Sequence, residues 1–173
     1  MKEELKNIGS YILGIGGFIL ILFLGILMIK GAVWVGEYLL QGLINFSWVV
    51  FAINIFILLP LAIFKKTGVV GGIGMHISSY VFGLTLWFLG LLLTYFTWGF
   101  VGIFIGLMLG GVGVIPVAML AMIVNGDFLT LLVLVFLTVL TFGTRILGVY
   151  LAAKAEKNED AKVYKDVEYE EID

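Results

Sequence analysis

The scarcity of charge through the middle of the chain constrains its fold more than any other feature. Of 173 residues, the 147 from 7 to 153 include only six with a formal charge. A soluble domain has about 25% charged residues, whereas this chain has 13% charged and 62% hydrophobic residues. It cannot cover itself with a water-facing surface, which excludes a soluble enzyme, a nucleic-acid-binding protein and a secreted disulfide scaffold. The six central charges are Lys30, Glu37, Lys65, Lys66, Asp127 and Arg145.

Apolar runs of helical length divide the chain into membrane-embedded segments. A helix rises about 1.5 Å per residue, so about 20 apolar residues cross a hydrocarbon layer of about 30 Å. The sequence therefore predicts an all-α integral membrane protein, a polytopic helical bundle with five membrane-embedded segments. These segments are residues 8–29, 43–64, 77–94, 100–124 and 128–151, which together make up the bundle 8–151.

The remaining stretches are expected to lie outside the hydrocarbon. Residues 1–7 form a short charged N-terminal segment, and residues 152–173 form an acidic tail that we expect to be disordered on its own. Residues 31–42 are too short to cross and combine aromatic residues with Glu37. This mixture suits the membrane interface, so we expect a surface helix or a dipping loop there.

The distribution of basic residues bears on the number of crossings. If all five segments cross, the termini lie on opposite sides and the ten basic residues divide four against six. If the termini share a side, nine basic residues lie there and Lys30 alone lies opposite. The cytoplasmic preference of Lys and Arg favours the second arrangement, with the N-terminus in the cytoplasm. It requires residues 100–124 to enter and leave by one face, as a re-entrant pair of short helices broken at the glycines of 110–113 before Pro116.

A glycine stripe in the same stretch favours the opposite conclusion. Gly102, Gly106 and Gly110 repeat every four residues and so share one face of a helix. Such a stripe lets two helices approach closely, which is useful only if the helix is unbroken. We therefore assign these three glycines to helix packing and narrowly favour five crossings with a kinked fourth helix. Four crossings plus one re-entrant segment remain the alternative.

A few polar side chains within or beside the apolar segments are candidates for function. Arg145 lies far along the last segment, where a lone Arg ordinarily reaches for lipid headgroups. It also shares a helix face with Thr138 and Thr141, a polar seam that would bind an anionic group. Glu37 would pair with Arg145 if all five segments cross, and is otherwise a solvated interfacial acid. Asn54 lies near the middle of the second segment, where we expect it to hydrogen-bond a neighbouring helix.

The chain lacks the residue groups that catalysis, metals or cofactors require. It has no Cys and one His, and neither paired carboxylates nor a nucleophile with its base can be found. We therefore expect no catalytic, cofactor-binding or metal-binding residues and no enzyme activity. The net charge of −2 argues against nucleic acid as a partner.

The leading hypothesis is a non-catalytic subunit or accessory protein that acts through helix–helix contacts. Its partners would be the lipid bilayer and other membrane-protein subunits or further copies of the same chain. The alternative is a small oligomeric transporter or channel, which requires an aqueous path along a polar face. Either protein would reside in a bacterial inner membrane or a plasma membrane. The polar face of the alternative consists of Asn54, Thr138, Thr141 and Arg145.

Overall fold

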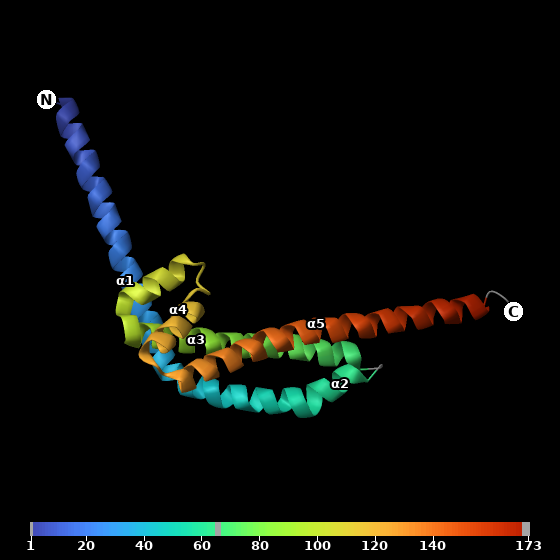
Figure 1. The fold of residues 1–173 in the computed structure, drawn as a ribbon. Helices are drawn as coiled ribbons and strands as arrows, with labels where there is room; N and C mark the ends of the chain where they lie inside the picture. The colour runs from blue at the N-terminus through green and yellow to red at the C-terminus, as the bar shows by residue number, and fades with distance from the viewer. Residues whose placement is uncertain (1, 65–66, 171–173) are drawn as a thin grey trace.

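The protein is entirely helical over the residues that its computed structural model describes. These are residues 2–64 and 67–170, with side chains described for 14–64 and 67–158. The elements are α1 (Lys2–Ile53), the π-helical turn η1 (Asn54–Leu58), α2 (Leu59–Ile63), α3 (Gly68–Met108), α4 (Val114–Asn125) and α5 (Phe128–Glu170) (Figure 1). The prediction of an all-α protein is confirmed.

Three helical stretches are long and apolar enough to cross a membrane. They are Gly14–Ile63, Gly68–Met108 and Phe128–Asn158, of 50, 41 and 31 residues. About 20 residues suffice for one crossing, so the two longest stretches have the length for two. Length and hydropathy together therefore identify a multi-pass membrane protein.

Helix α3 forms the centre of the bundle. Figure 1 shows α5 running back along α3, with the second half of α1 and then α2 on another side of it. Leu86 of α3, Ala118 of α4 and Leu134 of α5 are buried together in one apolar cluster. The first half of α1 leaves this bundle, and every large hydrophobic side chain from residue 15 to residue 28 is exposed (Figure 1). A helix that is apolar on all sides is suited to lipid or to a partner helix.

Small residues bring the backbones of α3 and α5 into direct contact. A Cβ atom added to Gly72 would lie 2.6 Å from the carbonyl oxygen of Gly148 and 2.7 Å from the backbone nitrogen of Ala152. One turn earlier, a Cβ on Gly68 would lie 2.6 Å from the Cβ of Ala155. Close approach of this kind maximises van der Waals contact, which drives helix association in lipid, where apolar burial gains little.

The opposite side of the same glycine run meets α2 and η1. Gly71 faces the backbone of Ala62, and a Cβ on Gly74 would lie 2.6 Å from a methyl group of Leu58. The run from 71 to 74 is therefore ordinary helix whose alternating faces touch two different neighbours. It has no unwound backbone, unlike the similar Gly-rich run at 110–113.

Two flanking stretches differ from expectation. Residues 31–42 form no separate interfacial element, because α1 continues through them as helix. Helix α5 continues to Glu170, where the composition predicts a disordered tail in residues 152–173. Ala, Lys and Glu are frequent in that stretch and are strong helix formers. The preceding helix also supplies the nucleus that an isolated segment would have to form at a cost.

Asp127 caps the start of α5. Its carboxylate accepts hydrogen bonds from the backbone N–H and the hydroxyl of Thr130, at 3.1 and 2.6 Å. The preceding Gly126, with φ of 72°, ends α4 in the left-handed conformation that glycine adopts freely. The bonds from Thr130 lower the pKa of Asp127 below its ordinary value, the side-chain bond contributing most.

The contact between α3 and α5 predicts a strong effect of one added methyl group. We expect Gly72→Ala to destabilise the protein by about 1–3 kcal/mol, because the methyl group meets backbone atoms that cannot move aside. Gly143→Ala in α5 is the matched control, since nothing lies within 4 Å of its added Cβ and Ala favours helix. Unfolding in detergent, followed by circular dichroism, measures both; equal stability of the two variants would contradict this packing.

The cap at Asp127 predicts a pH-dependent loss of stability. A carboxyl with a lowered pKa in the folded state stabilises the fold above its unfolded pKa of about 3.9, and that contribution disappears as pH falls through the folded pKa. Asp127→Ala should therefore lower the melting temperature at pH 7, with the difference from wild type narrowing below about pH 4. Asp127→Asn keeps a capping oxygen that does not titrate. The pH dependence of its difference in melting temperature from wild type should therefore differ from that of Asp127→Ala. A wild-type advantage over Asp127→Ala that is constant from pH 7 to pH 3 would show that the ionised cap is unimportant.

Candidate functional site

The predicted fourth segment, 100–124, is a helical hairpin and not one helix. Gly99 interrupts α3 with φ of 63° and ψ of −151°, a conformation that is nearly exclusive to glycine. The nine residues from Phe100 to Met108 then form the first arm, and the twelve of α4 form the second. At about 1.5 Å per residue, neither arm can cross a 30 Å layer. Pro116 lies within the first turn of α4, where its missing N–H needs no partner.

The tip of the hairpin is fastened to α3 by side-chain donors. The indole Nε1 of Trp87 donates to the carbonyl oxygen of Gly111 at 2.9 Å, and the hydroxyl of Thr94 donates to the carbonyl of Val114 at 3.1 Å. Trp87 precedes Gly99 by twelve residues, or about 18 Å along α3. The turn of the hairpin therefore lies beside the middle of α3 and not at its Gly99 end.

The outer surface of the tip is apolar and exposed. The side chains of Met108, Leu109 and Val112 are 74%, 65% and 58% exposed. Between them Gly110 and Gly111 both have positive φ, so the backbone is not helical there. Non-helical backbone at membrane depth is tolerated where protein or water covers it, and is not found against lipid.

The three glycines assigned to helix packing do not form one stripe. Gly106 packs closely, since its added Cβ would lie 2.9 Å from the Cα of Val114 on the other arm of the hairpin. Gly102 lies against Thr94 and Trp98, which belong to the part of α3 before the bend at Gly99. Gly110 is in the turn at the tip, with nothing within 4 Å of its added Cβ. The end of the helix at Met108 explains the place of Gly110, because only Gly102 and Gly106 remain on the continuous first arm.

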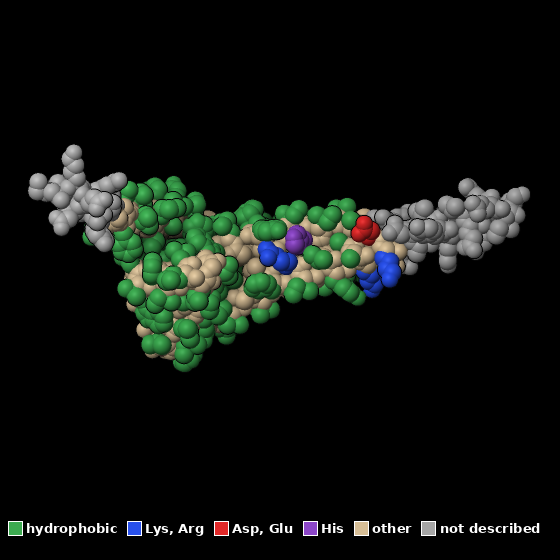
Figure 2. Space-filling view, turned by 90° about the horizontal axis from the view of Figure 1, so that it is seen from above, with side chains coloured by type: hydrophobic (Ala, Val, Ile, Leu, Met, Phe, Trp, Pro, Cys, Tyr) green, Lys and Arg blue, Asp and Glu red, His purple; other side chains and the backbone are tan. Residues whose placement is uncertain are grey.

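Arg145 lies against α3, in a polar cluster with Ser79, Tyr80 and His76. Its Nε donates to the Oγ of Ser79 at 3.3 Å, and its guanidinium carbon lies 4.8 Å from the centre of the Tyr80 ring. The Tyr80 hydroxyl lies 3.5 Å from Nε2 of His76. Figure 2 shows the single His beside a basic side chain on a face that is otherwise mostly hydrophobic. The sequence does not predict this cluster, because the closeness of His76 and Arg145 depends on the register of α3 against α5.

The structure does not bring Glu37 and Arg145 together. Gly36, next to Glu37, lies beside Phe88 of α3, with 3.0 Å from its added Cβ to the ring. Arg145 contacts Ser79, nine residues or about 14 Å away along the same helix. Glu37 itself is exposed.

Asn54, Thr138 and Thr141 hydrogen-bond to their own helices. The amide of Asn54 donates to the carbonyl of Val50 at 2.8 Å, and its buried Oδ1 has no partner among the described residues. Thr138 and Thr141 each donate to the carbonyl four residues earlier, at 2.7 Å. Thr141 and Arg145 do share the face of α5 that meets α3, where Thr141 lies 3.4 Å from a Cβ built on Gly83. Asn54 makes no hydrogen bond to any of these residues among those the structure describes.

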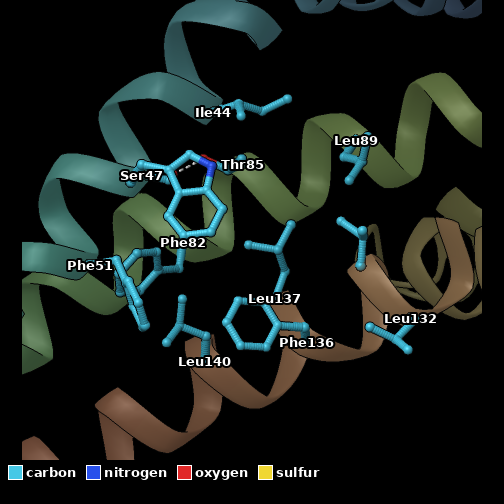
Figure 3. Close-up of a pocket in the computed structure, with 12 residues that line it drawn as sticks. Ile44, Ser47, Phe51, Phe82, Thr85, Leu89, Leu132, Phe136, Leu137 and Leu140 are labelled. Atoms are coloured by element: carbon cyan, nitrogen blue, oxygen red, sulfur yellow. Dashed lines mark hydrogen bonds between the residues drawn. The ribbon is translucent and has the colours of Figure 1, made fainter. Parts of the chain in front are cut away.

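A cleft of about 270 Å³ lies between α1, α3 and α5 (Figure 3). Its walls are almost wholly apolar and aromatic, and Phe51 and Phe136 pack edge to face across it, with ring centres 6.2 Å apart. One polar pair interrupts the wall: Thr85 donates to the Val81 carbonyl, so the Ser47 hydroxyl is the donor in the 2.8 Å bond to Thr85. This bond joins α1 to α3, and the rest of the lining of the cleft is apolar.

Among the described residues, no group of three or more His, Asp or Glu side chains is placed to hold a metal ion. The polar residues of the site are thus one cation, its hydroxyl and imidazole neighbours, and hydroxyls that bond to backbone. No protein-family model, curated protein or solved structure matches this chain.

Proposed function

We propose that this chain is a non-catalytic subunit or accessory protein of a membrane assembly, and that the tip of its hairpin is the surface that contacts the partner. The observation that carries the proposal is the exposure of Met108, Leu109 and Val112 around a non-helical turn that lies beside the middle of the apolar helix α3. Lipid offers no hydrogen bonds to such a backbone, whereas a partner helix or a second copy would cover it.

The first half of α1 supports the same proposal. Its large side chains from residue 15 to residue 28 are all exposed and apolar, although they belong to one of the most hydrophobic stretches of the chain. Several of its glycines, among them Gly16, Gly17 and Gly25, have nothing within 4 Å of an added Cβ. Glycines of this kind leave room for another helix to approach closely.

For the topology we propose four crossings and one re-entrant hairpin, with both termini in the cytoplasm of a bacterial or plasma-membrane setting. Two short arms joined by a turn, together with the division of nine basic residues against Lys30 alone, support this arrangement. It requires α1 to bend in the bilayer near residues 30–42, because a straight helix would carry 8–29 into water beyond Glu37. Gly31, Gly36 and Gly42 each lower the helix propensity of that stretch, which the structure shows as continuous helix.

Cross-linking from the tip tests the proposed function. The chain contains no native cysteine, so Val112→Cys can carry a photoactivated benzophenone label at one defined site. In native membranes we expect this label to give a discrete cross-linked protein band, and affinity purification in mild detergent to recover the same companion. The matched control is Val139→Cys, an equally exposed valine on α5 outside the hairpin.

The outcome at the two labelled positions decides the matter. A band from Val112→Cys and only lipid adducts from Val139→Cys are expected. Lipid adducts alone from both positions, with the chain purifying as a monomer, would overturn the proposal. A transporter or channel instead predicts that water-soluble thiol reagents modify a cysteine placed at Thr141, which under the present proposal stays protected at the buried face of α5.

A further inference from the structure

The polar cluster at Arg145 has donors that the protein itself does not use. One guanidinium N–H is bonded to Ser79, and the other N–H groups have no acceptor among the described residues. The Tyr80 ring lies under the guanidinium and so restrains its plane. Over the part of the chain whose side chains are described, no acidic side chain pairs with Arg145, and an unpaired cation beside apolar segments is costly.

The neighbouring imidazole extends the same surface. His76 and Tyr80 are one helical turn apart, with their rings edge to face and their centres 5.5 Å apart. When Nε2 of His76 carries the proton and donates to the Tyr80 oxygen, the Tyr80 hydroxyl is free to donate outward. The cluster then combines a fork of N–H groups with a neighbouring O–H, which are donors suited to an anion.

The position of the cluster indicates which anion is within reach. Arg145 follows the exposed Asp127 by eighteen residues, or about 27 Å along α5, so the two lie at opposite edges of a 30 Å hydrocarbon layer. Tyr80 and Ile77, beside the cluster, are exposed. The guanidinium is therefore at the depth of the headgroup phosphates of one leaflet, on a face open to lipid.

We propose that Arg145 and Tyr80 bind the phosphate of an anionic phospholipid headgroup, with His76 holding the Tyr80 hydroxyl in place. The planar guanidinium matches two phosphate oxygens, and the Tyr80 hydroxyl can reach a third. A carboxylate from a partner helix has only two oxygens and would leave one of these donors unused. This inference is independent of the hairpin and of any partner protein.

Lipid binding to the full-length chain in detergent tests the site. We expect native mass spectrometry with phosphatidylglycerol to show one saturable bound lipid, preferred over phosphatidylcholine. Arg145→Gln should weaken that binding about ten-fold or more, as expected for loss of charge-assisted hydrogen bonds. Arg145→Lys keeps the charge but not the fork, and should give an intermediate loss; it serves in place of Arg145→Gln if that variant does not fold.

Two controls separate this site from general attraction and from free phosphate. Lys154→Gln removes an exposed charge from the same helix and should leave the preference nearly unchanged. Inorganic phosphate at millimolar concentration should not displace the lipid, because it has no acyl chains to gain binding energy from the apolar face. Displacement would identify free phosphate as the ligand and would overturn a lipid site. Three other results would also overturn a lipid site. The chain could bind both lipids equally, or Arg145→Gln and Lys154→Gln could weaken lipid binding equally. A protein present in fixed stoichiometry could also occupy Arg145 in place of the lipid.

Discussion

The backbone contact of α3 with α5 is the interaction on which the rest of this structure depends. Gly72 and Gly148 allow the two helices to touch without intervening side chains, and this contact fixes one antiparallel register. In that register Arg145 meets Ser79 and Tyr80, and Leu134 enters the cluster that also buries Leu86. A shift by one turn would separate each of these pairs by about 5 Å. The polar cluster at Arg145 therefore depends on the register that Gly72 and Gly148 set.

The hairpin depends on the same central helix. Trp87 and Thr94 of α3 satisfy two carbonyl oxygens near its turn, so the inner side of the tip is part of the folded chain. The outer side, at Leu109 and Val112, has no such cover among the described residues. The difference between the hydrogen-bonded inner side and the exposed outer side is the physical basis of the proposed role.

The sequence was sufficient for the class of protein but not for its internal contacts. Long uncharged runs have few physical solutions other than membrane helices, and the bend at Gly99 falls between the predicted segments 77–94 and 100–124. The spacing of Gly102, Gly106 and Gly110 misled, because periodicity assumes the continuous helix that Gly110 and Gly111 interrupt. The stripe that does pack, through Gly68 and Gly72, spans elements whose register no local pattern specifies. A Trp at position 87, inside an apolar run and away from its ends, was the available signal for a buried indole bond.

In the proposed topology, residues 100–125 enter and leave the membrane by the same face. The most direct test places single cysteines on either side of the hairpin and treats sealed vesicles with a membrane-impermeant thiol reagent. Right-side-out and inside-out vesicles together show from which side of the membrane each cysteine reacts. Trp98→Cys and Asn125→Cys are suitable because both positions are exposed and the chain has no other cysteine. We expect both cysteines to react from one and the same side. Reaction of the two cysteines from opposite sides would show that this segment crosses the bilayer and would rule out a re-entrant hairpin.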